Sequence, residues 1–354
     1  MTLPWSSEET LSRVEHLVEA CIGPVAQLIR PTPLAGALQI ATFQILRAHV
    51  QSPQREEELT SMLLGAYVTA TEWVLKLIDS GPGPSLNWGQ YDKYGGSAES
   101  EGSTGADFAL LVCFSDSFAR ASVFQAKVSE DVNRVSVHRI APLRLPRAGT
   151  ETTRLPEPQT LRLVDYGLMT ISSTDANDLH WMHYCAYSPT SFFCIPLTQA
   201  SSIITGYRET KIDADVVLDK LYNDNKHTRG LSTLLKQQAG FLYKDHQDAS
   251  ISRCGKTREL IHLLAAGAAT EPDPEKPVPG WLTLTSAAAI GSFKKTFSKD
   301  VKIVELDATA APSPSPAADI VKHLNSAVSH YAQSVQIERP RNSSIGGGPA
   351  KPGM

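Results

Sequence analysis

The hydrophobic pattern centres on a nearly unbroken apolar run from Ala106 to Phe114. Such a run predicts a β-strand that is buried on both faces. The next residues, Ser115-Asp116-Ser117, are small and polar and favour a turn. A second apolar segment, Ala121–Val128, is expected to return as the neighbouring strand.

The second strand carries polar side chains on one face. Because side chains alternate along a strand, Gln125 and Lys127 project from the same face, with Val123, while Phe124, Ala126 and Val128 share the other. A buried Lys is rare unless it is paired. The neighbouring strand begins near Asp107. An acid, an amide oxygen and an ammonium group held close together on a sheet can bind a divalent cation next to a phosphate.

Three helices are predicted before these strands. The first begins at the Ser6–Glu9 capping box and should end near Arg30, before Pro31. The second spans Leu34–Val50 and the third Arg55–Ile78. The third helix opens with three consecutive glutamates, which suit the positive end of the helix dipole.

A polar, glycine-rich segment at 79–105 is expected to be a loop. After the two central strands, the pattern predicts a helix at Gln159–Ile171 and strands at Leu179–Tyr187 and Phe192–Leu197. The order helix, strand, strand, helix, strand predicts an α/β protein in which helices cover a sheet.

Beyond residue 200 the pattern is mainly helical. Helices are expected at about 214–223, 230–243 and 256–265, followed by a proline-rich linker at 270–280, weak strand signals at 281–306 and a short helix at 319–333. We therefore divide the chain into N-terminal helices (1–54), a core (55–200), a mainly helical region (201–308) and a spacer, short helix and disordered tail (309–354).

Composition narrows the class of protein. The chain has 354 residues, of which 42% are hydrophobic and 20% charged, as in an ordinary folded protein. Its net charge of −4 argues against a generally basic surface, so any nucleic-acid contact must come from local patches. The five cysteines are widely spaced and form no CxxC pair, which favours a reducing, cytoplasmic location over a zinc site. No secretory signal or membrane span is expected.

The most basic stretch follows the second central strand, at 133–158. Its arginines Arg134, Arg139, Arg144 and Arg147 are candidate contacts to nucleic-acid phosphates. The alternative interpretation is an ordinary solvated loop.

Together, the glutamate-rich helix, the Gly-Ala-Asp strand and the Gln-x-Lys strand, followed by a helix and a strand, resemble the PD-(D/E)xK nuclease superfamily. The resemblance is to its Mrr-like and related branches, in which Gln replaces the second acid. It covers about residues 55–198 and implies a restriction-endonuclease-like core, a mixed sheet flanked by helices. Asp107 and Gln125, the anchors of the motif, are eighteen residues apart.

The resemblance implies a role for each matching residue. Asp107 would be the main metal-bridging carboxylate, Gln125 would lend an oxygen to the metal, and Lys127 would orient the attacking water or stabilise phosphate charge. The implied metal is Mg²⁺ or Mn²⁺. A further carboxylate would come from the upstream helix, where the choice stays open among Glu56 (paired with Thr60), Glu57, Glu58 and Glu72. Gln159 lies where relatives sometimes hold a polar active-site residue.

These roles imply a metal-dependent endonuclease that acts on DNA, as an oligomer or in a complex, with a bacterial anti-phage system as the context that the family suggests. The alternative is a catalytically inactive nuclease-fold subunit that binds nucleic acid or a partner protein. A helical scaffold in which the Gln-Ala-Lys strand is incidental is also open.

Two other motifs are interpreted as structural. His180 and His183 are three residues apart on a strand and so face opposite sides, which is poor geometry for a shared metal. The Gly255-Lys256-Thr257 sequence lacks the upstream glycine and strand of a P-loop.

Overall fold

A computed structural model describes residues 33–51, 54–77, 84–91, 100–145, 153–268 and 276–304. The helix expected before Arg30, the helix expected at 319–333 and the tail lie outside these residues. So does Arg147, which is one of the four arginines proposed to contact nucleic acid.

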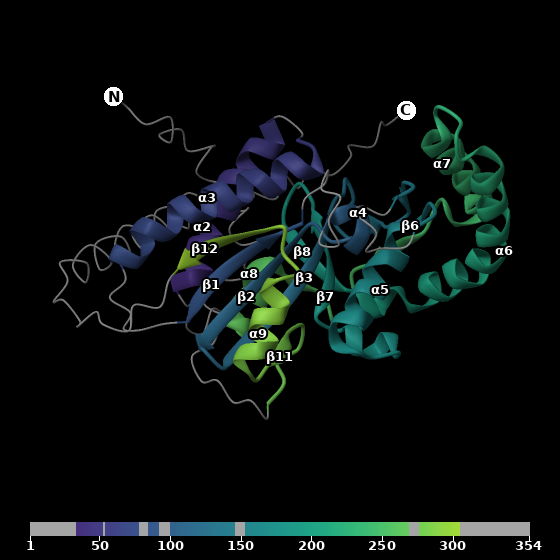
Figure 1. Ribbon diagram of the computed structural model, residues 1–354. Coiled ribbons are helices and arrows are strands. Elements are labelled where there is room, and N and C mark those ends of the chain that lie inside the picture. The colour runs from purple at the N-terminus through teal and green to yellow at the C-terminus, as the bar shows by residue number, and fades with distance from the viewer. Residues whose placement is uncertain are drawn as a thin grey trace, which may run out of the picture.

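The described residues fold around one mixed eight-stranded sheet (Figure 1). The strand order is β10-β8-β7-β3-β2-β1-β12, and β11 pairs with the first half of β3. The strands are β1 (Ser85–Gln90), β2 (Phe108–Ser115), β3 (Phe118–Val128), β7 (Met182–Tyr187), β8 (Phe192–Pro196), β10 (Arg258–Glu259), β11 (Leu282–Leu284) and β12 (Lys299–Val304). Only β3 and β7 pair in parallel within this sheet, because α5 (Gln159–Ile171) connects them as a crossover.

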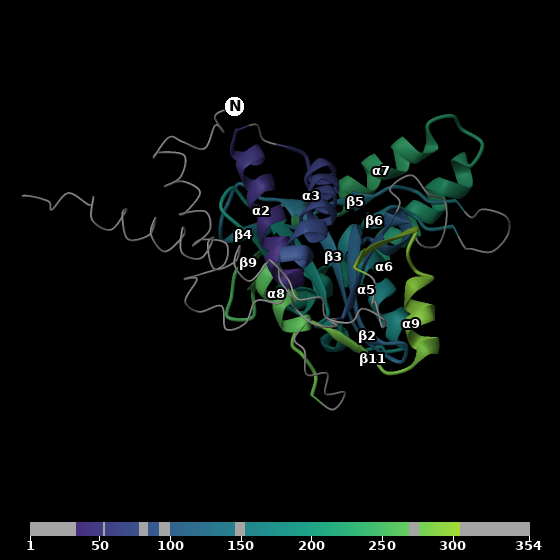
Figure 2. The ribbon, with the colours of Figure 1, turned by 90° about the vertical axis from the view of Figure 1, so that its left-hand side faces the viewer.

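Helices cover both faces of the sheet (Figure 2). On one face, α2 (Pro33–Gln51), α3 (Glu56–Leu77) and α8 (Leu260–Gly267) pack against the even-numbered side chains of β2 and β3. On the other face, α5, α6 (Ser201–Asn225), α7 (Leu231–Leu242) and α9 (Ala287–Lys294) share a core with the odd-numbered ones. The expected α/β fold, with a mixed sheet flanked by helices, is therefore confirmed.

A row of stacked rings crosses the sheet on its first face. Ring centroids are 4.5 Å apart between Trp88 and Phe108, 4.7 Å between Phe108 and Phe124, and 5.5 Å between Phe124 and His183. These residues come from four adjacent strands, so the row fixes the register of β1, β2, β3 and β7.

Smaller elements complete the structure. They are α4 (Glu101–Thr104), β4 (Arg134–Ser136), β5 (Ile140–Ala141), β6 (Glu157–Pro158) and β9 (Ser250–Ser252), with 3₁₀ turns at Ala176–Leu179, Leu197–Ala200 and Lys244–His246. β4 pairs with β9, and β5 pairs with β6. Within the described ranges, no helix is long and apolar enough to cross a membrane.

The prediction of a continuous loop at 79–105 is wrong, because this segment contains β1 and α4. The sequence of β1 does not show the hydrophobic pattern of a buried strand, because Asn87 and Gly89 stand among its apolar residues. The structure explains why each of these two residues is present in the strand. Asn87 donates a hydrogen bond to the Asp300 carboxylate of β12 at 3.0 Å. Gly89 has no side chain because the ring of Phe297 occupies the space where one would lie.

The region after residue 200 also contributes to the sheet. Helices were expected there, and α6, α7 and α8 are present, but β10, β11 and β12 come from the same region. The core and the C-terminal region thus share one sheet and its two hydrophobic faces.

Candidate active site

The register of β2 and β3 brings Asp107 and Gln125 together. Phe108 pairs with Phe124, so the residues just outside this pair, Asp107 and Gln125, face each other. The Asp107 carboxylate accepts hydrogen bonds from Gln125 Nε2 and from the backbone N–H of Ala126, the latter at 2.6 Å. The sequence prediction that these two side chains meet is therefore confirmed.

Gly105 positions Asp107 by allowing a tight approach to α5. It ends α4 with φ = 70°, a left-handed conformation that favours glycine. A Cβ atom at this position would lie 2.8 Å from the carbonyl oxygen of Gln159 and 2.9 Å from the backbone nitrogen of Leu163. The glycine of the Gly-Ala-Asp motif is thus needed for α4, Asp107 and α5 to meet.

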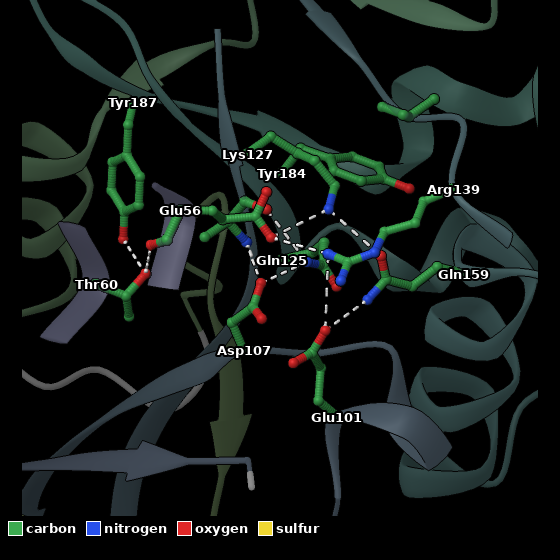
Figure 3. Close-up of polar contacts among 12 residues, drawn as sticks. Glu56, Thr60, Glu101, Asp107, Gln125, Lys127, Arg139, Gln159, Tyr184 and Tyr187 are labelled. Carbon is green, nitrogen blue, oxygen red and sulfur yellow. Dashed lines mark hydrogen bonds and ion pairs between the residues drawn. The ribbon is translucent and has the colours of Figure 1, made fainter. Parts of the chain in front are cut away.

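Lys127 belongs to the same cluster of polar groups and is 8% exposed. Its Nζ lies 3.4 Å from Glu56 Oε1 and 3.3 Å from Gln159 Oε1 (Figure 3). The end of β3 thus meets the start of α3 and the start of α5, and the buried ammonium group is paired.

Three further contacts close these groups into a ring. Arg139 Nη1 lies 3.2 Å from Glu56 Oε1 and 3.9 Å from Glu101 Oε1. Gln159 Nε2 donates to Glu101 Oε1 at 3.2 Å. We call the resulting cycle the polar ring, and its members are Lys127, Glu56, Arg139, Glu101 and Gln159 (Figure 3).

The electrostatic environment of Asp107 disfavours its charge. Burial of the carboxyl group, together with the nearby Glu101 and Glu56, raises the pKa of Asp107 well above its usual range. Lys127 and the Ala126 N–H act in the opposite direction but do not offset this. A cation bound beside Asp107 would favour the ionised carboxylate.

Gln125 supplies an unusual buried oxygen. The residue is 1% exposed, and its Oε1 has no hydrogen-bond partner in the described part of the chain. A half-turn of the amide would place this oxygen beside the Asp107 carboxylate, an arrangement that a bridging cation would stabilise. No group of three or more His, Cys, Asp or Glu side chains among the described residues could hold a metal ion. A Mg²⁺ site needs only one or two carboxylates, since this ion keeps several waters, so Asp107 and Gln125 fit it.

A cavity of about 770 Å³ opens beside this site. Asp107 and Glu101 form part of its wall, and the other walls come from the first turns of α3, the end of β1 and the start of β12. Its lining includes Arg55, Glu57, Glu58, Thr60, Ser61, Gln90, Tyr91, Ser298 and Lys299. The cavity is large enough to admit a small polar group to Asp107.

The other candidates on α3 have different surroundings. Glu57 and Glu58 line the cavity, and Glu58 accepts a hydrogen bond from the backbone of Arg55 at 2.9 Å. Thr60 bonds to Tyr187 at 2.9 Å and to the carbonyl oxygen of Glu56 at 3.0 Å. Glu56 is thus the α3 glutamate in the polar ring, and the Glu72 side chain lies outside the described residues.

The basic stretch is only partly at the site. Arg139 joins the polar ring, whereas Arg134 donates to Ser250 of β9 and Arg144 pairs through its backbone with Arg154.

His183 is buried and contacts the carbonyl oxygen of Gly280 at 3.0 Å, so it has a structural role, as the spacing of the histidines predicted.

Sequence reasoning missed Glu101. The residue was assigned to a loop, yet it begins α4 and is 8% exposed. Its local signal is weak, since α4 has only four residues, and its burial depends on Arg154 and Arg162, which donate to the carbonyl oxygens of Ser103 and Gly102.

Comparisons of the chain with protein-family models, with curated proteins and with solved structures found no match. The chemistry of the site therefore follows from its own geometry.

Proposed function

We propose that the protein is a divalent-metal-dependent phosphodiesterase that cleaves nucleic acid, with DNA as the first substrate to test. The convergence of Asp107, Gln125 and Lys127 beside an open cavity carries the proposal. The succession of α3, the β2–β3 pair, α5 and β7 along the chain supports it, since the resemblance to PD-(D/E)xK nucleases implies such a helix, strand pair, helix and strand.

Asp107 and Gln125 would hold the cation through oxygen atoms, which are the ligands that Mg²⁺ and Mn²⁺ prefer. When bound, such an ion supplies positive charge for the phosphate and lowers the pKa of a water ligand. The chain's own groups provide the remaining chemistry.

Lys127 is the cation best placed to act on the phosphate. It projects from β3 two residues after Gln125, on the same face, and Glu56 and Gln159 hold its ammonium group. A fixed positive charge there would stabilise the negative charge that develops on the phosphate as water attacks phosphorus and the bond to the leaving sugar oxygen breaks. Arg139, whose side chain is 40% exposed, can reach a neighbouring phosphate from the surface side of the ring.

A second candidate function is binding without cleavage. Lys127 is buried and already paired with Glu56, so a phosphate that reaches it must displace part of the polar ring. A protein that kept this ring closed would bind nucleic acid or a partner and not hydrolyse it.

Cleavage of plasmid DNA, single-stranded DNA and RNA in Mg²⁺ or Mn²⁺ tests the proposal. We expect wild-type protein to cut at least one substrate and Asp107→Asn to lose at least about a hundredfold in rate, since removing a group that stabilises transition-state charge has this effect. Asp116→Asn, an exposed carboxylate in the turn between β2 and β3, is the matched control. Metal-independent cleavage, or full activity of Asp107→Asn, would contradict the proposal, and binding with no cleavage would favour the second candidate.

A further inference from the structure

Glu101 and Asp107 lie together on the wall of the cavity, whereas Glu56 is not among the lining residues. Figure 3 shows the Asp107 side chain outside the polar ring, between Glu56 and Glu101. Of the two glutamates in the polar ring, Glu101 is therefore the one that shares the cavity with Asp107.

Glu101 is held in place by the elements around it. Gln159 Nε2 holds its Oε1 at 3.2 Å, and Gly105 anchors the end of α4 against α5. Arg154 donates to the Ser103 carbonyl oxygen at 2.9 Å, and the fully buried Arg162 donates to that of Gly102. Such support from surrounding groups is what orients a metal ligand.

Two carboxylates on the wall of one cavity repel each other when both are charged, and a proton or a cation between them relieves this repulsion. Gln125 Oε1, which is buried and has no partner in the described part of the chain, would add a third oxygen beside Asp107 once the amide turned, since Nε2 is the atom that contacts Asp107 here. Two carboxylates and an amide oxygen match the charge and the ligand type of a divalent cation.

Glu56 has a different set of contacts. Its Oε1 lies 3.4 Å from Lys127 Nζ and 3.2 Å from Arg139 Nη1. If Glu56 bound the cation through this oxygen, Lys127 and Arg139 would lose the carboxylate that they share. The same contacts suit a positioning residue that fixes Lys127 and Arg139 for contact with a phosphate.

From this geometry we infer that Glu101 is the second carboxylate ligand of the divalent cation, with Asp107 and Gln125, and that Glu56 positions Lys127 and Arg139. The inference rests on the proposed function, because it completes the metal site proposed there. In this assignment the additional carboxylate ligand comes from α4, whereas the resemblance implies that it comes from α3.

Isothermal titration calorimetry of the full chain with Mn²⁺ tests this assignment without relying on nuclease activity. Glu101→Gln should weaken Mn²⁺ binding at least about tenfold, because it removes a charged ligand. Glu56→Gln should keep Mn²⁺ affinity within about threefold of wild type while nucleic-acid cleavage falls at least about tenfold. Asp116→Asn, which changes the same charge far from the site, should match wild type in both measurements.

Glu101→Asp is a control for the case in which Glu101→Gln does not fold. It keeps the charge and shortens the side chain, so Mn²⁺ affinity should fall between wild type and Glu101→Gln, with an unchanged melting temperature in the absence of metal. Wild-type Mn²⁺ affinity in a folded Glu101→Gln, together with a tenfold loss in Glu56→Gln, would overturn the inference and leave the proposed function standing. No Mn²⁺ binding by wild type would overturn the metal site and the proposed function together.

Discussion

The charges around Lys127 are balanced at the level of single residues. Glu56 and Gln159 hold its ammonium group, and Arg139 contacts the same carboxylate oxygen of Glu56 as Lys127 does. Asp107 lies outside this ring, where burial and the two glutamates raise the pKa of its carboxyl group. The ring thus keeps its cations paired, while Asp107 is the group that a bound cation would stabilise.

Lys127→Met should separate binding from catalysis. The substitution keeps the length of the side chain and removes the charge, so cleavage should fall at least about a hundredfold, as for other groups that stabilise transition-state charge. Mn²⁺ affinity should remain within about threefold, because Lys127 is not a ligand. Single-turnover cleavage and calorimetry measure the two effects, and a parallel loss of both would contradict the role given to Lys127.

His183 predicts a pH dependence of stability. Burial lowers the pKa of His183 to about 4, from 6.5, although its contact with the Gly280 carbonyl oxygen acts in the opposite direction. Between these values the unfolded chain binds a proton that the folded protein does not, so the free energy of unfolding falls as pH decreases from about 6.5 to 4. The predicted loss is roughly 3 kcal/mol.

Urea unfolding at pH 7 and pH 4.5 measures this loss. His183→Gln keeps a side chain that can donate to Gly280 and has no titratable group, so its stability should depend less on pH over this range. An unchanged pH dependence in the variant would show that other groups cause it.

At the scale of elements, the site depends on how α4 packs against α5. Gly105→Ala should destabilise the protein by about 1–3 kcal/mol, because its φ of 70° is strained for alanine and its Cβ would meet the backbone of α5. Mn²⁺ affinity should also fall, since α4 and Asp107 flank this residue. Thermal unfolding and calorimetry measure both effects.

Gly65→Ala is a matched control. Gly65 lies inside α3, is exposed and has no heavy atom within 4 Å of an added Cβ. Alanine is favoured there, so this variant should be more stable by about 0.5–1 kcal/mol. Equal effects of the two substitutions would contradict the packing role of Gly105.

Elements with strong periodicity were predicted well from sequence. The strands around Ala106–Phe114 and Ala121–Val128 are β2 and β3, and the helix expected at Gln159–Ile171 is α5 with the same bounds. The alternation rule also placed Gln125 and Lys127 on one face. These successes depend on local patterns.

The missed elements depend on distant contacts. β1 is specified by pairing with β12, more than 200 residues away, and α4 is held by Arg154 and Arg162. Glu101 could not be found because four residues carry no periodic signal. Glu56 could be placed near Lys127 by analogy, but only the structure shows that it contacts two cations.

At the scale of the molecule, the C-terminal region completes the sheet. β10 pairs with β8, β11 with β3 and β12 with β1, while α8 packs into the core beneath α2. A chain that ends at residue 200 would lose these strands and expose the edges of β1 and β8. We predict that such a chain shows no cooperative thermal unfolding by circular dichroism, whereas a chain that ends at residue 308 does. Cooperative unfolding of the shorter chain would show that residues 1–200 are a separate folding unit.

The claim that Asp107 and Gln125 form a metal centre is tested most directly by anomalous diffraction from crystals soaked in Mn²⁺. We predict an anomalous peak about 2.1 Å from oxygens of Asp107 and Gln125, the distance that is usual for a small divalent cation. A Glu101 oxygen at the same distance would complete the ligand set. Peaks confined to other surfaces, with the Asp107 and Gln125 oxygens uncoordinated, would contradict the metal-dependent mechanism.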